Sequence, residues 1–211
     1  MFGFRPKVHV TAETALPGRD TPIVDVSKLR HRVFGEPLDT EYPDSQIGFF
    51  ALGCFWGAEK LFWKLPGVVS TAVGYQGGFT ANPSYQQVCT GLTGHAETVR
   101  VVFDPTAINY ADLVQTFFEH HDPTQGDRQG NDIGTQYRSA IFISSRDQQQ
   151  TAEEMRTDYQ QALTEAGFGQ ITTTVEPATP FYFAEGYHQQ YLDANPGGYD
   201  CHVRTGVACP I

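Results

Sequence analysis

Residues 47–65 read IGFFALGCFWGAEKLFWKL and decide how the neighbouring chain folds. Their first six residues are an uninterrupted apolar run, which predicts a short buried strand. Gly53 then turns the chain, and apolar residues recur at helical spacing until Pro66 and Gly67 provide a stop signal. The segment therefore predicts a strand that passes directly into a helix, with Cys54 at the junction.

Beyond this segment, predicted strands and helices alternate, with loops rich in glycine, proline and polar residues between them. Further strands are expected at 68–75, 96–103, 137–143 and 171–175, and further helices at 110–121, 145–167 and 184–194. No glycine motif for dinucleotides or phosphates stands at a strand–helix turn. Because the strands are few and the loops long, we expect an α+β fold. It would be a two-layer sandwich in which helices cover a mixed or antiparallel sheet.

A length of 211 residues suits a single domain. Prolines break any periodicity in residues 1–45, which we expect to form a long irregular arm. Residues 46–195 hold the alternating elements and are expected to form the catalytic core. Residues 196–211 contain three glycines and two of the four cysteines, and they are expected to form an irregular C-terminal tail.

The composition excludes several classes of partner. The chain has 24 acidic and 14 basic side chains, a net charge of −10, so it offers no basic surface for nucleic acid or anionic membranes. It contains no apolar run long enough for a signal sequence or a membrane span. Four dispersed cysteines do not make a secreted disulfide framework. We therefore expect a cytoplasmic protein, in which spaced cysteines point to catalysis or metal binding.

Cys54 is the first candidate for a reactive residue. At the start of a helix its sulfur lies near unpaired backbone N–H groups and the positive end of the helix dipole, which favours the thiolate. The competing interpretation is a small, buried and inert cysteine. Its position supports reactivity but does not define a reaction.

Cys201 and Cys209 form a second signal, because they lie eight residues apart in the glycine-containing tail. Such a tail can carry one cysteine to a distant sulfur, and a bond between the two closes only a short loop. A structural zinc site with His202 or His95 as further ligands is the alternative. No Cys-x-x-Cys pair is present, so the spacing favours a redox relay over zinc.

Glu97 is the third candidate. Strand alternation places it on one face with Val99 and Val101, and it places Thr98 and Arg100 on the other face. A solvated carboxylate would be expected on the face of Thr98 and Arg100. An apolar face disfavours the charged carboxylate, so the pKa of Glu97 should rise toward values that suit a general acid. The alternative is an exposed glutamate at a fraying strand end.

Aromatic residues gather around these candidates. Phe55 and Trp56 follow Cys54 directly, and Tyr85 and Tyr137 stand at the edges of two polar loops. Such clusters are usually part of a core, but tyrosines at loop edges can also donate hydrogen bonds into an apolar pocket. His188 lies on the last predicted helix, and no role for it follows from the pattern.

Short blocks spread over about residues 50–195 occur in an order typical of one known family. They are GCFWG (53–57), GYQGG (74–78), NPSY (82–85), GHAE (94–97), HDP (121–123), QGNDIGTQYRS (129–139) and HQQYL (188–192). With these blocks the chain resembles the type A peptide methionine sulfoxide reductases. The resemblance implies reduction of the S epimer of methionine sulfoxide, free or in proteins, as a repair of oxidative damage.

The resemblance also implies residue roles. Cys54 matches the thiolate that attacks the sulfoxide sulfur, and Glu97 matches the acid that protonates the oxygen. Tyr85 and Tyr137 match the hydrogen-bond donors to that oxygen, and Asp132 matches an acidic residue of the same pocket. Phe55 and Trp56 match the aromatic walls around the S-methyl group; this assignment completes the expected substrate site.

The family's chemistry leaves the attacking cysteine as a sulfenic acid, which condenses readily with a thiol. By resemblance, Cys201 resolves it as a disulfide with Cys54, and Cys209 then takes over Cys201 by thiol–disulfide exchange. Thioredoxin reduces the resulting bond, and no metal or organic cofactor is implied. The linker around Arg204 is poorer in glycine than in many relatives, and Cys89 matches no required role. We expect the chain to act as a monomer.

Other functions remain open at this level. A thiol peroxidase would also form a sulfenic acid, but it needs no aromatic methyl pocket beside the nucleophile. A cysteine hydrolase could pair a cysteine with His188, yet the two tail cysteines would then have no purpose. A peptide-binding or redox-sensing module could use the same aromatic residues without turnover.

Overall fold

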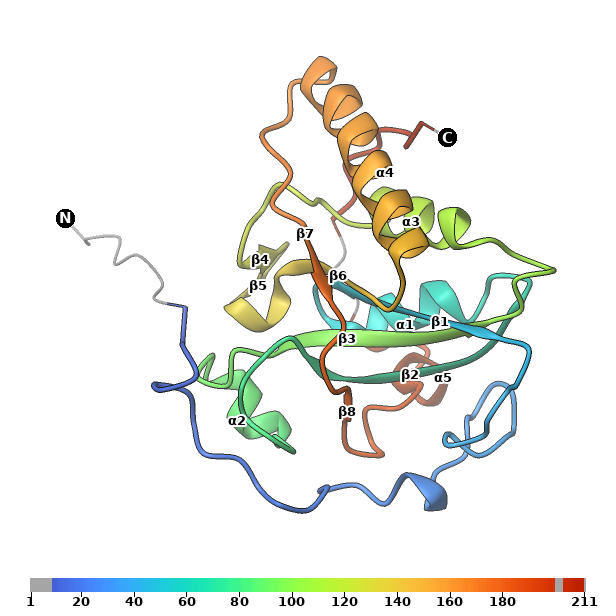
Figure 1. Ribbon diagram of the computed structural model, residues 1–211, viewed down its shortest axis with the longest axis vertical. Coiled ribbons are helices and arrows are strands. Elements are labelled where there is room, and N and C mark those ends of the chain that lie inside the picture. Colours follow the sequence, from blue (N-terminus) through green and yellow to red (C-terminus); the bar gives the residue numbers. More distant parts are fainter. Residues whose placement is uncertain (1–8, 200–202, 211) are drawn as a thin grey trace.

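A computed structural model describes residues 9–199 and 203–210 of the chain (Figure 1). The strands are β1 (Gln46–Leu52), β2 (Val68–Gln76), β3 (Ala96–Phe103), β4 (Arg128–Gln129), β5 (Asp132–Ile133), β6 (Ser139–Ile143), β7 (Thr174–Pro177) and β8 (Tyr182–Phe183). The α-helices are α1 (Phe55–Phe62), α2 (Tyr85–Cys89), α3 (Tyr110–Glu119), α4 (Arg146–Glu165) and α5 (Tyr191–Ala194), and 3₁₀ turns occupy Val26–Lys28 and Thr135–Tyr137.

Six of the strands form one sheet in the order β7-β6-β1-β3-β2-β8. All neighbouring pairs are antiparallel except β6 and β7, which run parallel. The short strands β4 and β5 form a separate antiparallel pair. The sheet is mixed and carries helices, so the expected α+β class is confirmed.

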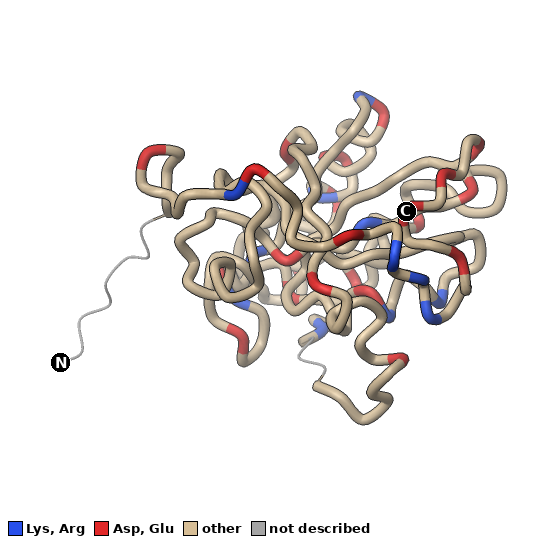
Figure 2. Tube along the Cα trace, turned by 90° about the horizontal axis from the view of Figure 1, so that it is seen from below, with Lys and Arg blue, Asp and Glu red and all other residues tan. Residues whose placement is uncertain are grey.

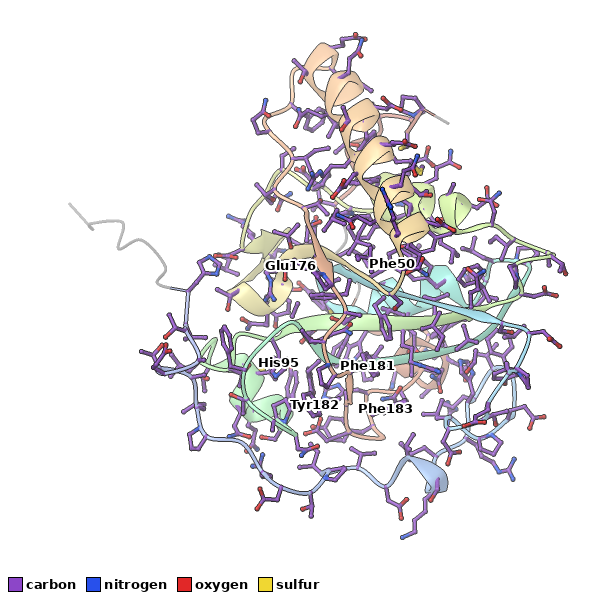
Figure 3. All side chains as sticks on the ribbon, viewed as in Figure 1. Phe50, His95, Glu176, Phe181, Tyr182 and Phe183 are labelled. Atoms are coloured by element: carbon purple, nitrogen blue, oxygen red, sulfur yellow. The ribbon has the colours of Figure 1, made fainter. Side chains whose placement is uncertain are left out.

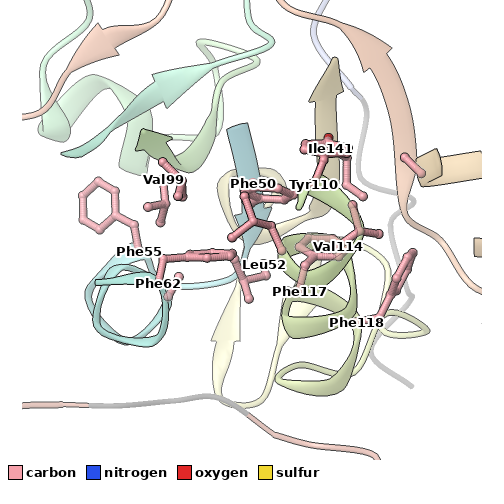
Figure 4. Close-up of a cluster of buried hydrophobic side chains, with 14 of the residues drawn as sticks. Phe50, Leu52, Phe55, Phe62, Val99, Tyr110, Val114, Phe117, Phe118 and Ile141 are labelled. Carbon is pink, nitrogen blue, oxygen red and sulfur yellow. The ribbon is translucent and has the colours of Figure 1, made fainter. Parts of the chain in front are cut away.

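The main core lies between the sheet and helices α1, α3 and α4 (Figures 1 and 4). Phe50 of β1 is at its centre and stacks on Phe62 of α1, with ring centroids 4.9 Å apart. It also contacts Tyr110 and Phe117 of α3, each at 5.9 Å. Burial of these rings fixes α1 against the sheet and so fixes the strand-to-helix junction at Cys54.

The opposite face of the sheet is also buried, contrary to the expectation from alternation. Thr98 has no exposed surface, and Arg100 beside it is only partly exposed. A smaller apolar cluster of Ala51, Ala96, Ala140 and Phe142 lies on this face. Phe49 packs against this cluster, and Phe181 covers Phe49 with ring centroids 5.6 Å apart. Phe181 directly precedes Tyr182 and Phe183 of β8 (Figure 3). Loops therefore cover the face that has no large helix.

Several elements are shorter in the structure than predicted, and some short elements of the structure were not predicted. The strand predicted at 137–143 begins at Ser139, because residues 135–137 form a 3₁₀ turn. The strand predicted at 171–175 lies further along the chain than expected, as β7 at Thr174–Pro177. The helix predicted at 184–194 shrinks to α5, since residues 186–190 are turns and Gln190 has a left-handed φ of 46°. Short elements such as α2, whose capping box involves Ser84 and Gln87, have too few residues to show periodicity.

A buried polar network ties the N-terminal arm to α1. His31 of the arm bonds Thr71 of β2 at 2.9 Å, and the Thr71 hydroxyl donates to the Glu59 carboxyl of α1 at 2.9 Å. Glu59 also accepts the backbone N–H of Gln190 at 2.8 Å and its side-chain amide at 2.6 Å. The arm, the sheet, α1 and the turn before α5 are thus joined at one point, where every buried group has a partner.

Candidate active site

A small cavity of about 110 Å³ opens where β1 passes into α1. It is lined by Cys54, Phe55, Trp56, Tyr85, Glu97, Asp132, Tyr137 and Tyr199. The first seven are the residues that the sequence and the family resemblance singled out for the nucleophile, the acid and the substrate contacts. The fold therefore brings together groups that are up to 83 positions apart in the chain (137 minus 54).

Cys54 is the N-cap residue of α1 and is 7% exposed. The turn before it requires Gly53, whose φ of 101° is unfavourable for any other residue. A Cβ atom at Gly53 would also come within 2.7 Å of the Gln129 side chain. The expected position of the cysteine at a strand–helix junction is confirmed.

Glu97 lies at the start of β3 and is 2% exposed, as alternation predicted. Its carboxyl accepts a hydrogen bond from the backbone N–H of Phe55 at 3.0 Å. Burial raises the pKa of Glu97 to about 8, and the nearby Asp132 charge acts in the same direction, against the Phe55 hydrogen bond. At neutral pH the carboxyl beside Cys54 is therefore mostly protonated and able to give up a proton.

The two tyrosines reach the cavity from different elements. Tyr85 is the first residue of α2, and its backbone N–H donates to Glu185 at 2.9 Å. Glu185 also accepts the Tyr75 hydroxyl at 2.9 Å, which ties α2 to β2. Burial raises the pKa of both Tyr85 and Tyr137, so both hydroxyls stay protonated and can donate hydrogen bonds.

Trp56 forms the aromatic side of the cavity together with Phe55. The Trp56 indole stacks on Tyr191 of α5 with ring centroids 3.8 Å apart. Its Nε1–H donates to Nδ1 of His188 at 3.1 Å. Aromatic faces of this kind suit a small apolar group such as a methyl.

Tyr199 lines the cavity but was absent from the sequence-based candidates. Its hydroxyl donates to Oδ1 of Asp132 at 3.2 Å, across 67 positions of the chain. The buried Oδ2 atom of Asp132 has no hydrogen-bond partner among the described residues. Neither residue belongs to a periodic pattern. Tyr199 could have been predicted only by expecting the C-terminal tail to form part of the cavity wall.

Cys209 lies outside the cavity, and Cys201 lies outside the described residues. Cys209 is 4% exposed and packs in the main core, and its backbone N–H donates to Glu119 of α3 at 2.9 Å. The tail before it is held by the Tyr159 hydroxyl, which bonds Thr205 at 2.7 Å and donates to the Val207 carbonyl at 3.1 Å. Burial raises the pKa of the Cys209 thiol to about 12, so it is a poor nucleophile in this docked position.

Acidic residues are spread over the described part of the chain trace (Figure 2), in line with the net charge of −10. Within residues 9–199 and 203–210, no three His, Cys, Asp or Glu side chains are grouped to hold a metal ion. No helix in the described part of the chain is long and apolar enough to cross a membrane.

The fold and the cavity together define a class of protein. A cysteine sulfur at a helix start, a protonated carboxyl beside it and tyrosine hydroxyls around aromatic walls are typical of a thiol-based enzyme. The cavity suits a substrate that presents a polar atom next to a small apolar group.

Comparison with known proteins identifies the family within this class. The family model of peptide methionine sulfoxide reductases matches residues 46–209. A peptide methionine sulfoxide reductase MsrA of Corynebacterium kroppenstedtii is 54% identical over 99% of this chain and 98% of the relative. One from Streptomyces griseus is 56% identical over 98% and 94%. The chain belongs to the peptide methionine sulfoxide reductase family and is an oxidoreductase that acts on a sulfur group.

Solved structures agree with this assignment. The methionine sulfoxide reductase A of Corynebacterium diphtheriae superimposes with a TM-score of 0.86 at 46% identity, covering 97% of this chain and 99% of that one. Yeast Mxr1 in its reduced form gives a TM-score of 0.71 at 36% identity, covering 78% and 95%. The fold and the enzyme class expected from the sequence are confirmed.

The raised pKa of Glu97 predicts a pH dependence of stability. From pH 4.5, the ordinary value of a glutamate, to about 8, the folded chain keeps a proton on Glu97 that the unfolded chain releases. This contribution to the free energy of unfolding is present below pH 4.5 and is lost as the pH rises through about 8. Glu97→Gln should remove this contribution. The free energy of unfolding of the variant, taken relative to that of wild type, should therefore rise as the pH goes from about 5 to about 9.

Denaturant unfolding at the two pH values measures this gain. Glu41→Gln, at an exposed position of the arm, is the matched control and should track wild type. Equal pH dependence in wild type and Glu97→Gln would contradict a protonated, buried Glu97.

Proposed function

We propose that this enzyme reduces the S epimer of methionine sulfoxide, free or in peptides and proteins, with Cys54 as the nucleophile and Glu97 as the general acid. The observation that carries the proposal is the buried Glu97 carboxyl, bonded to the N–H of Phe55, in the same 110 Å³ cavity as Cys54. A proton donor is needed there because the sulfoxide oxygen is a poor leaving group until it is protonated.

The first half-reaction transfers two electrons from Cys54 to the substrate. The Cys54 sulfur attacks the sulfoxide sulfur, and Glu97 gives its proton to the oxygen as the S–O bond is weakened. The protonated oxygen takes up a second proton and leaves as water. A water molecule then attacks the Cys54 sulfur and loses a proton, which breaks the new S–S bond, releases methionine with its sulfur reduced and leaves Cys54 as a sulfenic acid. No metal or organic cofactor takes part in this step.

Substrate orientation is assigned to the remaining cavity residues. The S-methyl group lies against Phe55 and Trp56, and the oxygen accepts hydrogen bonds from Tyr85 and Tyr137. The raised pKa of both tyrosines supports their role, because a phenolate could not donate. Asp132 is assigned to the same pocket through its buried Oδ2 atom, which has no partner within the described chain and can accept a hydrogen bond from the substrate.

The second half-reaction regenerates the thiol. Cys201 condenses with the sulfenic acid, releasing water and forming a disulfide with Cys54. Cys209 then attacks Cys201, which frees Cys54 and forms a bond that an external dithiol reduces. Because Cys209 is buried against α3 and α4 with a high thiol pKa, its part of the tail has to leave this site before it reacts.

Thioredoxin is the proposed reductant. Yeast Mxr1, whose reduced form is 36% identical to this chain, has also been solved in complex with Trx2. The cytoplasm is the proposed compartment, since dispersed cysteines that cycle through thiols need a reducing environment. Within one catalytic domain, residues 46–195 would supply every cavity residue except Tyr199, and residues 196–211 would carry the relay.

The proposed reaction predicts selectivity between the two sulfoxide epimers. With thioredoxin, thioredoxin reductase and NADPH, the enzyme should consume the S epimer of a blocked methionine sulfoxide and leave the R epimer. Cys54→Ser should abolish this turnover because it removes the attacking sulfur. Chiral chromatography of the product measures both outcomes. Consumption of peroxide without sulfoxide turnover would instead indicate a thiol peroxidase.

The acid role of Glu97 predicts a slower first half-reaction. Glu97→Gln keeps the size of the side chain but removes its acidic proton, so sulfenic acid formation should slow by about 10²–10⁴-fold. Rapid quench with a sulfenic acid trap measures the rate, and Glu41→Gln is the control. A change of less than about threefold would assign proton delivery to another group.

The order of the relay predicts separable effects of the cysteines. Cys209→Ser should release one methionine per enzyme in a single turnover, yet it should not be recycled by thioredoxin. Cys89→Ser controls for the loss of a thiol. Its side chain contacts Tyr85, so its rate can change, but thioredoxin should still recycle it. Normal thioredoxin-dependent cycling by Cys209→Ser would refute the proposed order.

A further inference from the structure

His188 packs against three aromatic residues that line the cavity, Phe55, Trp56 and Tyr85, and none of the steps above uses it. His188 is buried, with 1% of its surface exposed. Its ring centroid is 4.2 Å from Tyr187, 4.5 Å from Tyr85, 5.2 Å from Phe55 and 5.8 Å from Trp56. Three of these four neighbours are proposed to hold the substrate, so His188 is placed to affect all three together.

The hydrogen bond from Trp56 defines the state of the His188 ring. Nδ1 accepts the indole N–H at 3.1 Å, so Nδ1 carries a lone pair and the ring proton of the neutral form is on Nε2. Burial lowers the pKa of His188 to about 4, while the Glu185 charge has the smaller opposite effect. The ring is therefore neutral at physiological pH and keeps its acceptor.

The backbone around His188 is held on both sides. The Gln189 amide accepts the N–H of Val73 at 3.0 Å and donates to its carbonyl at 2.8 Å, which fixes this turn on β2. Gln190 bonds Glu59 of α1 through its backbone and its side chain. Trp56 also lies on α1. The helix that carries the donor Trp56 and the turn that carries the acceptor His188 are therefore also joined by the bonds between Gln190 and Glu59.

The indole of Trp56 depends on this acceptor for its orientation. Stacking on Tyr191 at 3.8 Å fixes the plane of the indole but allows it to slide or turn within that plane. A directed N–H bond removes this freedom, because its strength falls steeply when the angle departs from linearity.

We propose that His188 is a positioning residue for the reduction, which fixes the Trp56 indole against the substrate's methyl group through the hydrogen bond at 3.1 Å. It acts through the indole and transfers no proton to the substrate. The proposal rests on the proposed function, because that function assigns the methyl group to Trp56. It predicts that loss of the acceptor weakens substrate binding much more than it slows the chemistry.

The test compares His188→Phe, which keeps a ring but has no acceptor, with His188→Asn, whose amide oxygen can take the place of Nδ1. Nitrogen-15 spectra of labelled enzyme report the indole N–H directly, and Trp63, the other tryptophan, is the internal reference. In His188→Phe the Trp56 indole proton should shift and exchange faster with solvent, while the Trp63 signal stays in place. His188→Asn should restore most of the wild-type signal.

Kinetics with the S epimer give the second readout. His188→Phe should raise KM about tenfold, the effect of one neutral hydrogen bond, with kcat within about threefold of wild type. His188→Asn should recover most of the KM. In a Trp56→Phe background the His188 substitution should change KM little, because its effect runs through the indole. If His188→Phe does not fold, His188→Gln takes its place, since its amide is displaced from the Nδ1 position.

An unmoved Trp56 signal in the variant without the acceptor would overturn the proposal. So would an undiminished KM effect in the Trp56→Phe background, or a large fall in kcat at constant KM. The spectra do not depend on turnover. An enzyme inactive on the S epimer would therefore refute the proposed function while the indole signal still reported the hydrogen bond.

Discussion

A carboxyl group kept out of water beside a cysteine is the constraint on which the site depends. Glu97 is buried at the start of β3, and its hydrogen bond from Phe55 joins the strand to the first residue of α1. Antiparallel pairing sets Glu97 opposite Tyr75 of β2, whose hydroxyl donates to Glu185. Glu185 in turn accepts the N–H of Tyr85. One register between two strands thus places the acid and orients a substrate-facing tyrosine.

The rest of the fold serves to hold this register and the junction at Cys54. Phe50 packs α1 and α3 on the sheet, while the network around Glu59 joins α1 to the arm and to the turn that carries His188. These contacts make the cavity rigid, as a site with a short path for proton transfer requires. By contrast, Cys209 is docked on the helices, away from the cavity, so the proposed relay separates a fixed site from a tail that has to move.

The sequence alone was sufficient where one residue and its neighbours decide the outcome. The glycine turn predicted the junction at Cys54, and strand alternation predicted the burial of Glu97. Alternation failed for Thr98, because the cover on that face comes from Phe181 and neighbouring loops far along the chain. Tyr85 and Tyr137 were marked only by their positions at loop edges, and the family resemblance supplied their role. Asp132 was found through the resemblance alone, since no local pattern marks it.

Residues recruited across long separations could not be predicted from the sequence. Tyr199 lines the cavity and bonds Asp132, and His188 bonds Trp56 of the cavity wall, in each case across more than 60 positions of the chain. The turn that presents His188 was itself misjudged as helix, because the left-handed Gln190 is stabilised by Glu59 and not by any local preference.

The proposed chemistry requires that burial keeps Glu97 protonated beside Cys54 at neutral pH. A carbon-13 titration of the glutamate side-chain carboxyls, with Glu97→Gln to assign the signal, measures this most directly. A buried, protonated Glu97 should give a midpoint near pH 8, far above the ordinary value of 4.5. A midpoint close to 4.5 would mean an ionised carboxylate in the cavity, which contradicts Glu97 as the proton donor.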